Sequence, residues 1–409
     1  MARAVSPKPK VAGLIGRLAL GVIAALMAYV SVAHALANAL RSGSPERAYQ
    51  LTPWDGRIAG AYARKLAGPE ATQAVRARSD AVARLALRSD PTAVAAVTTL
   101  GINAQLRADD VTARRALHHA TRLSRRDLVT HLWGIENAVA RNDIPSALFH
   151  YDTALRTSRS APDILFPVLI SAISDPVIRS ALVKRMAEAR PDWGPTFLIG
   201  AANRNPDPLA ISAFFGALES ARTPVPQAAR SALMWKLFVA GRHQEAWQLY
   251  ASAHPGASRS RSQDPGFRSE GTDPAPFDWT IHNDAGVATS LQRDEQSSTL
   301  HFSTTSGGGG LLLDQHLVLP PGKYRLAGVS AQLEQPPQSQ PYWTLACTSG
   351  VELLRLQLPN SNIDRGRFGA EFLVPNGCPA QRLSLLARPS NEINGVGGQI
   401  RTVEIRPIR

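Results

Sequence analysis

Cysteine is scarce in this sequence, which contains only Cys347 and Cys378 among 409 residues. Two thiols alone cannot complete the four-ligand site of a structural zinc ion, and no histidine cluster lies near them in the sequence. They can form one disulfide in an oxidising compartment or stay as two buried thiols. Because Cys347 ends a predicted strand and Cys378 follows an Asn-Gly turn, we predict the disulfide.

Lysine is also rare, with six residues against 39 arginines, while aspartate and glutamate together number 32. The formal net charge of +13 could attract nucleic acid, anionic lipid or acidic glycans. The arginines, however, are scattered along the chain. No run of basic residues and no nucleic-acid-binding signature occurs. We therefore expect no nucleic-acid partner.

Recognisable catalytic motifs are absent. The chain has no Gly-x-Ser-x-Gly elbow, no His-Glu-x-x-His motif and no Cys-x-x-Cys pair, and the glycines at 307–310 lack the Lys-Ser/Thr of a phosphate loop. Glycoside hydrolysis needs two carboxylates facing a cleft, and the carboxylates of the C-terminal region fall mostly at turn or surface positions. We expect no enzymatic activity, no metal and no cofactor. The alternative is a polysaccharide-active enzyme with an unrecognised site.

The N-terminal region combines basic charge with a long apolar run. No acidic residue precedes Glu46, and the 23 residues from Leu18 to Leu40 carry no formal charge. At a rise of 1.5 Å per residue, a helix of this length spans a hydrocarbon layer of about 30 Å. The basic segment 1–17 before it predicts a cytoplasmic N-terminus and an exported remainder.

Two interpretations of this run stay open. Ala33, Ala35 and Ala37 resemble a signal-peptide cleavage site after an apolar region at 18–30. Apolar character continues to Leu40, which favours an uncleaved, single-pass anchor in the lipid bilayer. The Ala- and Arg-rich composition is typical of a GC-rich bacterial genome. We therefore expect a bacterial inner-membrane protein with its bulk in the periplasm, or, after cleavage, a soluble periplasmic protein.

Residues 45–253 show apolar residues at helical spacing and an internal repeat. In each copy, small alanines let two antiparallel helices approach closely, and a large residue between them fills the groove. Such a hairpin cannot bury its own face, so it stacks on the next one. The copies are Ala113, Leu117 and Ala120, then Ala147, Tyr151 and Ala154 34 residues later, then Ala246, Tyr250 and Ala253 after a Gly241 turn.

This region resembles the tetratricopeptide repeat family. The Trp and Pro of the family pattern are mostly absent, and prolines interrupt the periodicity between 158 and 230, where generic helical hairpins are expected. The resemblance implies a scaffold that binds a protein partner, here an unknown envelope protein. The alternative is an irregular helical bundle that supports the next domain.

After the helical region the sequence pattern changes twice. Residues 254–276 are rich in Gly, Ser, Pro, Arg and Asp without periodicity, which predicts a linker. From 277 onward the apolar period becomes two; for example, Trp343, Leu345 and Cys347 share one face of a strand. About eight short strands separated by Pro- and Gly-containing turns predict an antiparallel β-sandwich over 277–409.

The segment Leu317–Leu326 consists of a strand, a Pro-Pro-Gly turn, a tyrosine and a second strand. It is similar to the jelly-roll domains of carbohydrate-binding modules and galactose-binding-like proteins, over about 270–409. The resemblance implies glycan binding through aromatic faces that stack on sugar rings. Trp343 and Trp279 also fit the core, whereas Tyr342 points to the opposite face from Trp343. The glycan-binding candidates are Tyr342, Tyr324 and Trp279.

These features together predict a multidomain α plus β protein. Its parts are a basic N-terminus (1–17), a transmembrane helix (18–40), a helical hairpin solenoid (45–253), a linker (254–276) and a jelly-roll sandwich (277–409). We expect a membrane-anchored, non-catalytic accessory protein of the cell envelope, acting in the assembly or export of surface polysaccharide. The alternative is a protein-interaction scaffold with an inert sandwich.

Overall fold

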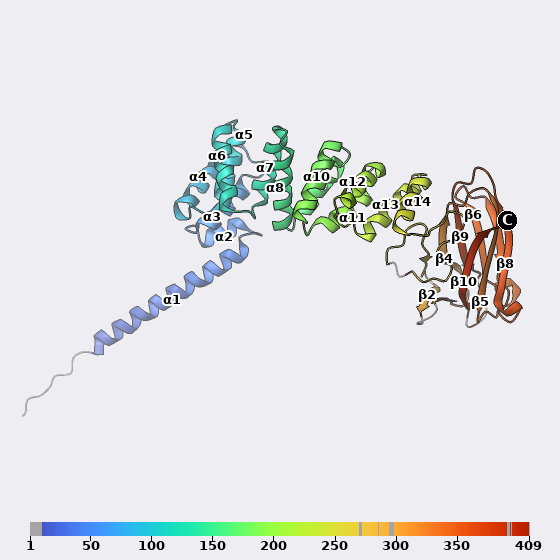
Figure 1. Ribbon diagram of the computed structural model, residues 1–409. Helices are drawn as coiled ribbons and strands as arrows, with labels where there is room; N and C mark the ends of the chain where they lie inside the picture. The colour runs from blue at the N-terminus through green and yellow to red at the C-terminus, as the bar shows by residue number, and fades with distance from the viewer. Residues whose placement is uncertain are drawn as a thin grey trace, which may run out of the picture. The chain divides into compact units, whose positions relative to one another are not determined.

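The computed structural model describes residues 10–269, 272–284, 286–293, 298–390, 393 and 395–408. Part of the predicted basic segment 1–17, namely residues 1–9, lies outside the described residues. Helices are followed along the chain by two antiparallel sheets (Figure 1). The predicted fold class is confirmed.

The chain divides into two compact units, Met1–Leu165 and Phe166–Arg409. The division falls inside the helix α9 (Ala161–Ala172) and not at 254–276, the segment predicted to be a linker. The second unit therefore contains the last helices together with the sandwich.

The first unit begins with α1 (Lys10–Leu40). From Gly16 to Leu40 this helix has 25 residues with a mean hydropathy of 2.0, long and apolar enough to cross a membrane by length and composition. A signal sequence meets the same description. Its large apolar side chains are exposed, whereas Ala37 is buried in a small cluster with Ala48 and Ile58. The end of α1 is thus packed on the folded unit.

Aspartate side chains begin several of the following helices. Asp55, Asp109, Asp127 and Asp143 each accept a hydrogen bond from a backbone N–H in the first turn of α3, α6, α7 and α8, which satisfies donors that a helix start leaves free. The helices are α2 (Pro45–Leu51), α3 (Gly56–Leu66), α4 (Gln73–Ser89), α5 (Val94–Leu106), α6 (Asp110–Leu123), α7 (Leu128–Ala140) and α8 (Ile144–Thr157).

The hairpins α5–α6 and α7–α8 pack in the same way. All three residues of the first repeat copy, on α6, and of the second, on α8, are buried. A Cβ on Gly101 would lie 2.6 Å from Leu117 Cγ, and one on Gly134 would lie 2.7 Å from the His150 ring. The predicted close helix approach is confirmed in these hairpins, while membership of the tetratricopeptide repeat family stays a prediction.

The second unit continues with five more helices. In the last repeat copy Ala246 and Tyr250 are buried, but Ala253 is exposed at the helix end. Gly241 supplies the turn before that helix with a φ of +76°, which favours glycine. The helices are α10 (Pro176–Ala189), α11 (Gly194–Arg204), α12 (Pro208–Ser220), α13 (Gln227–Val239) and α14 (His243–Ala253).

Two five-stranded antiparallel sheets form the sandwich, in the orders β1-β4-β9-β6-β7 and β2-β3-β10-β5-β8. We call them the first and the second sheet. The strands are β1 (Thr280–Ile281), β2 (Val287–Arg293), β3 (Ser298–Thr304), β4 (Gly310–Leu317), β5 (Gly322–Ala331), β6 (Tyr342–Cys347), β7 (Glu352–Gln357), β8 (Arg367–Val374), β9 (Gln381–Ala387) and β10 (Gly397–Pro407).

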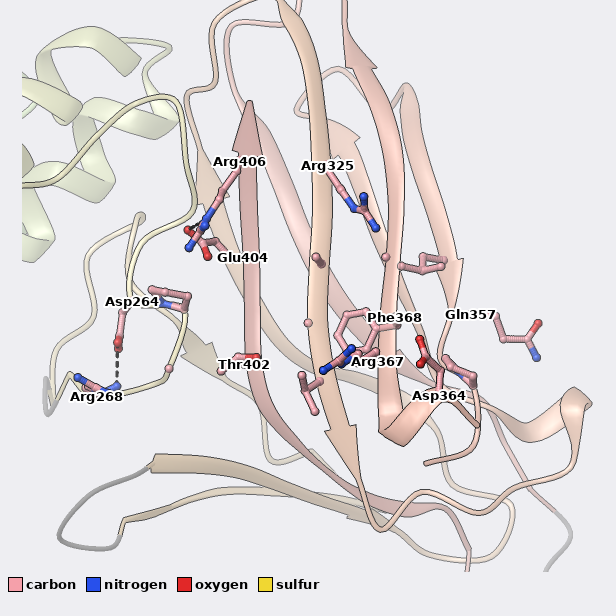
Figure 2. Close-up of a pocket in the computed structure, with 18 residues that line it drawn as sticks. Asp264, Arg268, Arg325, Gln357, Asp364, Arg367, Phe368, Thr402, Glu404 and Arg406 are labelled. Carbon is pink, nitrogen blue, oxygen red and sulfur yellow. Dashed lines mark hydrogen bonds and ion pairs between the residues drawn. The ribbon is translucent and has the colours of Figure 1, made fainter. Parts of the chain in front are cut away.

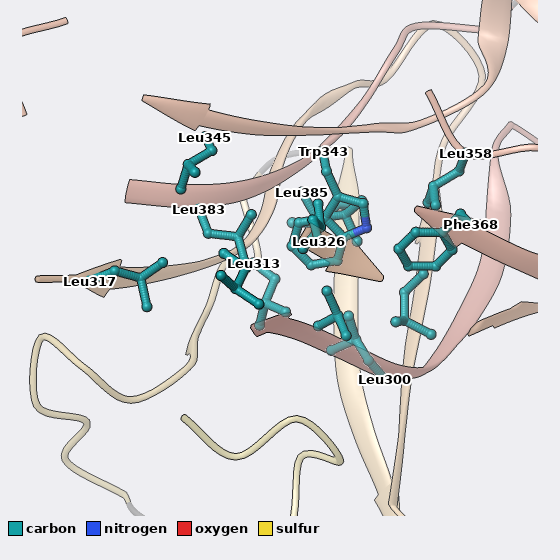
Figure 3. Close-up of a cluster of buried hydrophobic side chains, with 14 of the residues drawn as sticks. Leu300, Leu313, Leu317, Leu326, Trp343, Leu345, Leu358, Phe368, Leu383 and Leu385 are labelled. Carbon is teal, nitrogen blue, oxygen red and sulfur yellow. The ribbon is translucent and has the colours of Figure 1, made fainter. Parts of the chain in front are cut away.

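The inner faces of the two sheets enclose the core. Trp343 is fully buried among leucines from several strands, including Leu300, Leu326 and Leu385 (Figure 3). The predicted inward face of Trp343, Leu345 and Cys347 is confirmed. Cys347 forms a disulfide with Cys378, with their Cα atoms 5.5 Å apart, so the predicted disulfide is present.

The segment 254–276 packs against the sandwich. Ser262 exchanges backbone and side-chain hydrogen bonds with Ile405 on β10, and the N–H of Val403 donates to the carbonyl of Pro265 at 3.0 Å. Phe267 is fully buried in the sandwich core. The segment therefore extends the second sheet beside β10. Its Ser, Pro and Gly residues suppress any periodic signal, because irregular backbone rather than a repeating face carries the contacts.

The end of this segment also meets α13 and α14. Phe277 is fully buried and contacts the rings of Trp247, Tyr250 and Phe238 at centroid distances of 5.1, 5.2 and 5.9 Å. The Tyr250 hydroxyl donates a hydrogen bond to Asp278 at 2.7 Å. Aromatic packing thus joins the last helical hairpin to the start of the sandwich.

Candidate functional site

A groove of about 1230 Å³ crosses the outer face of the second sheet (Figure 2). Strands β10, β5 and β8 contribute its floor. Asp264 and Arg268 lie on one side of these strands, and Gln357 and Asp364 lie on the other. We call it the sheet groove.

Strand register explains why the face is hollow. Ala327 of β5 lies opposite Gly369 on β8 and Glu404 on β10, so the middle row has little side-chain bulk on β5 and β8. One row further along, Arg325 lies opposite Arg406. Two residues after Ala327 on β5, Val329 lies between Thr402 on β10 and Arg367 on β8. Because side chains alternate along a strand, these groups share the outer face while their neighbours fill the core.

The charges in the sheet groove are only partly neutralised within it. Glu404 forms an ion pair with Arg406, which raises the pKa of that guanidinium. The two carboxylate oxygens of Asp264 accept hydrogen bonds from the backbone N–H groups of Arg268 and Ser269, at 2.8 and 2.9 Å.

Two further arginines line the sheet groove. Within the described part of the chain, Arg325 and Arg367 form no ion pair with a carboxylate. Their guanidinium groups keep donor capacity for a ligand in the groove.

Tyr324, predicted to bind glycan, belongs to the core instead. Its side chain is only 4% exposed, and its ring stacks on Phe372 at 5.7 Å. Its hydroxyl donates a hydrogen bond to the Pro320 carbonyl at 2.9 Å. The turn at 320–322 starts β5 so that Tyr324 takes an inward position, and its ring has no face open to a ligand.

Trp279, the second candidate, is half-buried against the core beside Phe267 and Trp343. Its indole N–H donates to the carbonyl of Asp264 at 2.9 Å. Because Asp264 lines the sheet groove, Trp279 fixes the groove wall from behind.

Tyr342, the third candidate, lies half-buried on the outer face of the first sheet. The guanidinium carbons of Arg355 and Arg388 are each 4.9 Å from its ring centroid. Arg355 is also held by Glu352. Cation–π contacts therefore occupy the ring that was predicted to stack on a sugar. The structure does not bring the three predicted aromatic residues together.

The sequence reasoning missed the arginines of the sheet groove. A signal was present in the alternation Arg325, Ala327, Val329 and in Arg367 followed by Gly369, which marks outward polar and small positions. Only strand pairing shows that these positions meet.

No protein-family model matches the chain, and no curated protein matches it. Among solved structures, TmCBM61 in complex with β-1,4-galactotriose matches with 14% identity, 36% coverage of this chain, 97% coverage of that chain and a TM-score of 0.26. PilW, a type IV pilus biogenesis factor, matches with 16% identity, coverages of 49% and 94%, and a TM-score of 0.25.

Tailspike protein 4 of bacteriophage CBA120 also matches, with 14% identity and a TM-score of 0.23. The match covers 32% of this chain but only 19% of the tailspike chain. All three TM-scores are below 0.5, so these likenesses establish no relationship for the chain as a whole.

Proposed function

We propose that this chain is a membrane-anchored, non-catalytic accessory protein of the cell envelope whose sandwich binds a glycan in the sheet groove. The observation that carries the proposal is the open groove itself, with a low floor at Ala327 and Gly369 and polar side chains on both sides. Guanidinium, amide, hydroxyl and carboxylate groups are the partners that sugar hydroxyls require.

The glycan is an acidic one. Arg325 and Arg367 stand at opposite ends of the low floor and form no ion pair among the described residues, although Glu371 on β8 lies opposite Arg325 in the strand register. A guanidinium group binds a carboxylate in a bidentate manner, which adds geometric selectivity to charge. Successive acidic sugars along a polysaccharide would offer such groups to both arginines.

Binding without hydrolysis is supported by the state of the groove carboxylates. Glu404 is paired with Arg406, and both oxygens of Asp264 accept backbone hydrogen bonds. A glycosidase acid must carry a proton that it can deliver, and its partner must reach water or the sugar. Of the three carboxylates that line the groove, only Asp364 has no side-chain hydrogen bond or ion pair among the described residues, so the groove offers no pair of free carboxylates.

The anchor and the location are part of the proposal. Cleavage after Ala35 or Ala37 would remove packing that Ala33 and Ala37 make at the end of α1, which supports an uncleaved anchor. The disulfide suits an oxidising compartment such as the periplasm. We therefore place the bulk of the protein on the periplasmic side of a bacterial inner membrane.

The helical region is proposed to bind an envelope protein. A groove of about 910 Å³ on α6, α7 and α8 has no carboxylate among its lining residues and includes the half-exposed Phe149. This combination fits an acidic protein surface with an apolar residue. Its arginines are Arg114, Arg115, Arg122, Arg125 and Arg141.

The test is a glycan array probed with the full chain in neutral detergent. A fragment starting at residue 270 is unsuitable, because it lacks the core residue Phe267. We expect binding to uronate-containing polysaccharides over neutral ones, and a loss of about tenfold or more in the R325Q/R367Q variant. Arg401→Gln, an exposed arginine outside the groove, is the control.

Three results would contradict the proposal. Flat binding over all glycans would favour a scaffold with an inert sandwich. Equal losses in R325Q/R367Q and R401Q would mean non-specific charge attraction. Release of new reducing ends from any bound polysaccharide would favour the enzyme alternative.

A further inference from the structure

A second basic cavity, of about 840 Å³, begins where α1 ends. We call it the Arg41 cavity. Its lining residues come from the turn after α1, the start of α2, α3, the start of α5, the end of α6 and the segment before α7, and none of them is a carboxylate. Its cationic residues are Arg41, Arg57, Arg64, Lys65 and Arg126.

Only two of these cations are neutralised. Arg57 pairs with Asp90 at 3.1 Å, and Arg64 pairs with Asp127 at 2.7 Å. The other three, Arg41, Lys65 and Arg126, are exposed and have no carboxylate within ion-pair distance in the described part of the chain.

Two further features leave hydrogen-bond donors without acceptors. The Nε atom of Arg64 is buried and has no hydrogen-bond partner within the described chain. Ala93, Val94 and Ala95 line the cavity at the start of α5, where no side chain caps the helix. The free amide groups of a first helical turn add partial positive charge. An anion in the cavity would lie among these residues.

The position of the cavity along α1 indicates where that anion comes from. Leu36 is the last large apolar side chain of α1 that is exposed, at 48%. Arg41 follows five residues later, about 7 Å further along a helix axis. A lipid headgroup region is about 5–8 Å thick on each side of the hydrocarbon layer. The cavity therefore starts at headgroup depth if α1 crosses a bilayer.

An exposed tryptophan lies near the C-terminal part of α1. His34 of α1 contacts Asp55 at 3.5 Å, which ties the turn before α3 to the helix. Trp54, next to Asp55, is 58% exposed. Tryptophan concentrates at the membrane–water interface, because its ring is amphipathic. This residue supports an interfacial position for the C-terminal part of α1, after which the cavity begins.

We propose that the Arg41 cavity binds the phosphate-bearing headgroup of an anionic phospholipid in the membrane that α1 enters. This inference rests on α1 being an uncleaved anchor, as proposed above. Guanidinium and ammonium groups donate several charge-assisted hydrogen bonds to phosphate oxygens. Headgroup binding would hold the first unit against the bilayer at the end of its anchor.

The experiment is native mass spectrometry of the full chain in neutral detergent with equal amounts of dioleoylphosphatidylglycerol and dioleoylphosphatidylcholine. We expect the wild type to retain phosphatidylglycerol about tenfold or more over phosphatidylcholine, a preference that R41Q/K65Q/R126Q reduces to about twofold or less. The control R47Q/R78Q/R88Q removes the same charge at exposed positions outside the cavity and should keep the preference.

Additional measurements distinguish failure of the headgroup site from failure of the membrane anchor. Equal losses in the two triple variants would overturn the site in favour of diffuse charge attraction. Glycerol 1-phosphate binding as tightly as the lipid would make free phosphate the ligand. Release of the chain from membranes by alkaline carbonate would disprove the anchor, whereas retention without lipid preference would disprove only the headgroup site. If the triple variant does not fold, Lys65→Gln and Arg126→Gln alone should each lower the preference.

Discussion

The first unit and the sandwich are stabilised by different kinds of side chain. A core cluster of the first unit consists of six alanines from three neighbouring helices and the turn before the last of them. The sandwich core consists mainly of large apolar residues, among them Trp, Phe, Leu, Ile and Val from both sheets. An alanine buries little apolar area but permits close helix approach, whereas each large residue contributes about 1.5–3 kcal/mol.

The two regions also differ in how far apart in the sequence their packed elements lie. Hairpins of the first unit pack on sequence neighbours, as α5–α6 and α7–α8 do. In the sandwich, β10 pairs with β3, placing Ile400 opposite Leu300. Damage to a helical hairpin should therefore stay local, while damage to the sandwich core should spread through it. Region-specific probes such as hydrogen exchange are needed, because one unfolding midpoint does not describe two units.

The largest expected effect is that of Trp343→Ala. Removing this fully buried ring should lower the free energy of unfolding of the sandwich by about 3–5 kcal/mol. Hydrogen exchange should accelerate in strands of both sheets. Leu117→Ala on α6 is the helical counterpart and should accelerate exchange only around α5–α8. If the exchange changes were confined to β6, damage to the sandwich core would be as local as damage to a helical hairpin, contrary to this prediction.

Loss of the disulfide should come next. With a sequence separation of 31 between the cysteines, replacing both by serine should cost about 3–4 kcal/mol in the chain-entropy model. Dithiothreitol should lower the thermal midpoint of the sandwich and leave that of the first unit unchanged, since the sequence has no other cysteine. Equal shifts in both units would show that the two regions unfold together.

Acid should affect the first unit through Asp127. Burial alone would raise the pKa of this carboxyl, but the Arg64 guanidinium and the Thr130 hydroxyl and N–H outweigh it, and the pKa is lowered. A lowered folded-state pKa stabilises the fold above the unfolded value of about 3.9 and loses this contribution as pH falls through the folded value.

Asp127→Asn should therefore cost about 1–2 kcal/mol at pH 7, a modest figure because the Arg64 side chain is 36% exposed. Hydrogen exchange in α7, followed from pH 6 to pH 2 at matched intrinsic rates, is the measurement. Wild type and variant should converge as the pH falls through the lowered folded-state pKa of Asp127. A constant difference at every pH would refute the charge contribution.

The smallest effect is expected at a helix cap. Asp207 accepts hydrogen bonds from the N–H groups of Leu209 and Ala210 at the start of α12. Asp207→Ala should cost about 1 kcal/mol and fray that helix, whereas Asp207→Asn should be nearly neutral because asparagine caps equally well. Circular dichroism with exchange at α12 tests both. An equal loss in the two variants would point to charge rather than capping.

Periodic signals account for what could be predicted. The apolar run of α1, the Ala–large–Ala spacing on α6 and α8, and the alternation around Trp343 are local patterns that report helix or strand faces directly. The disulfide was also predictable, because only two cysteines exist and both fall in the strand-rich region. For the glycan-binding candidates, residue type gave no placement: Tyr324 is buried, Trp279 supports a wall of the sheet groove, and two guanidinium groups lie against the Tyr342 ring.

What the sequence by itself determined is the order and kind of elements: an apolar helix, alanine-rich hairpins and short alternating strands. The tertiary structure alone decided that 262–267 joins the sandwich and that Arg325 and Arg406 lie on one side of the Ala327–Gly369 row and Arg367 on the other. The physical reason is the sequence separation of the interacting residues. Helix and strand periodicity arise within a few residues, whereas the groove needs pairing between strands that lie tens of residues apart, and one sequence carries no direct record of that pairing.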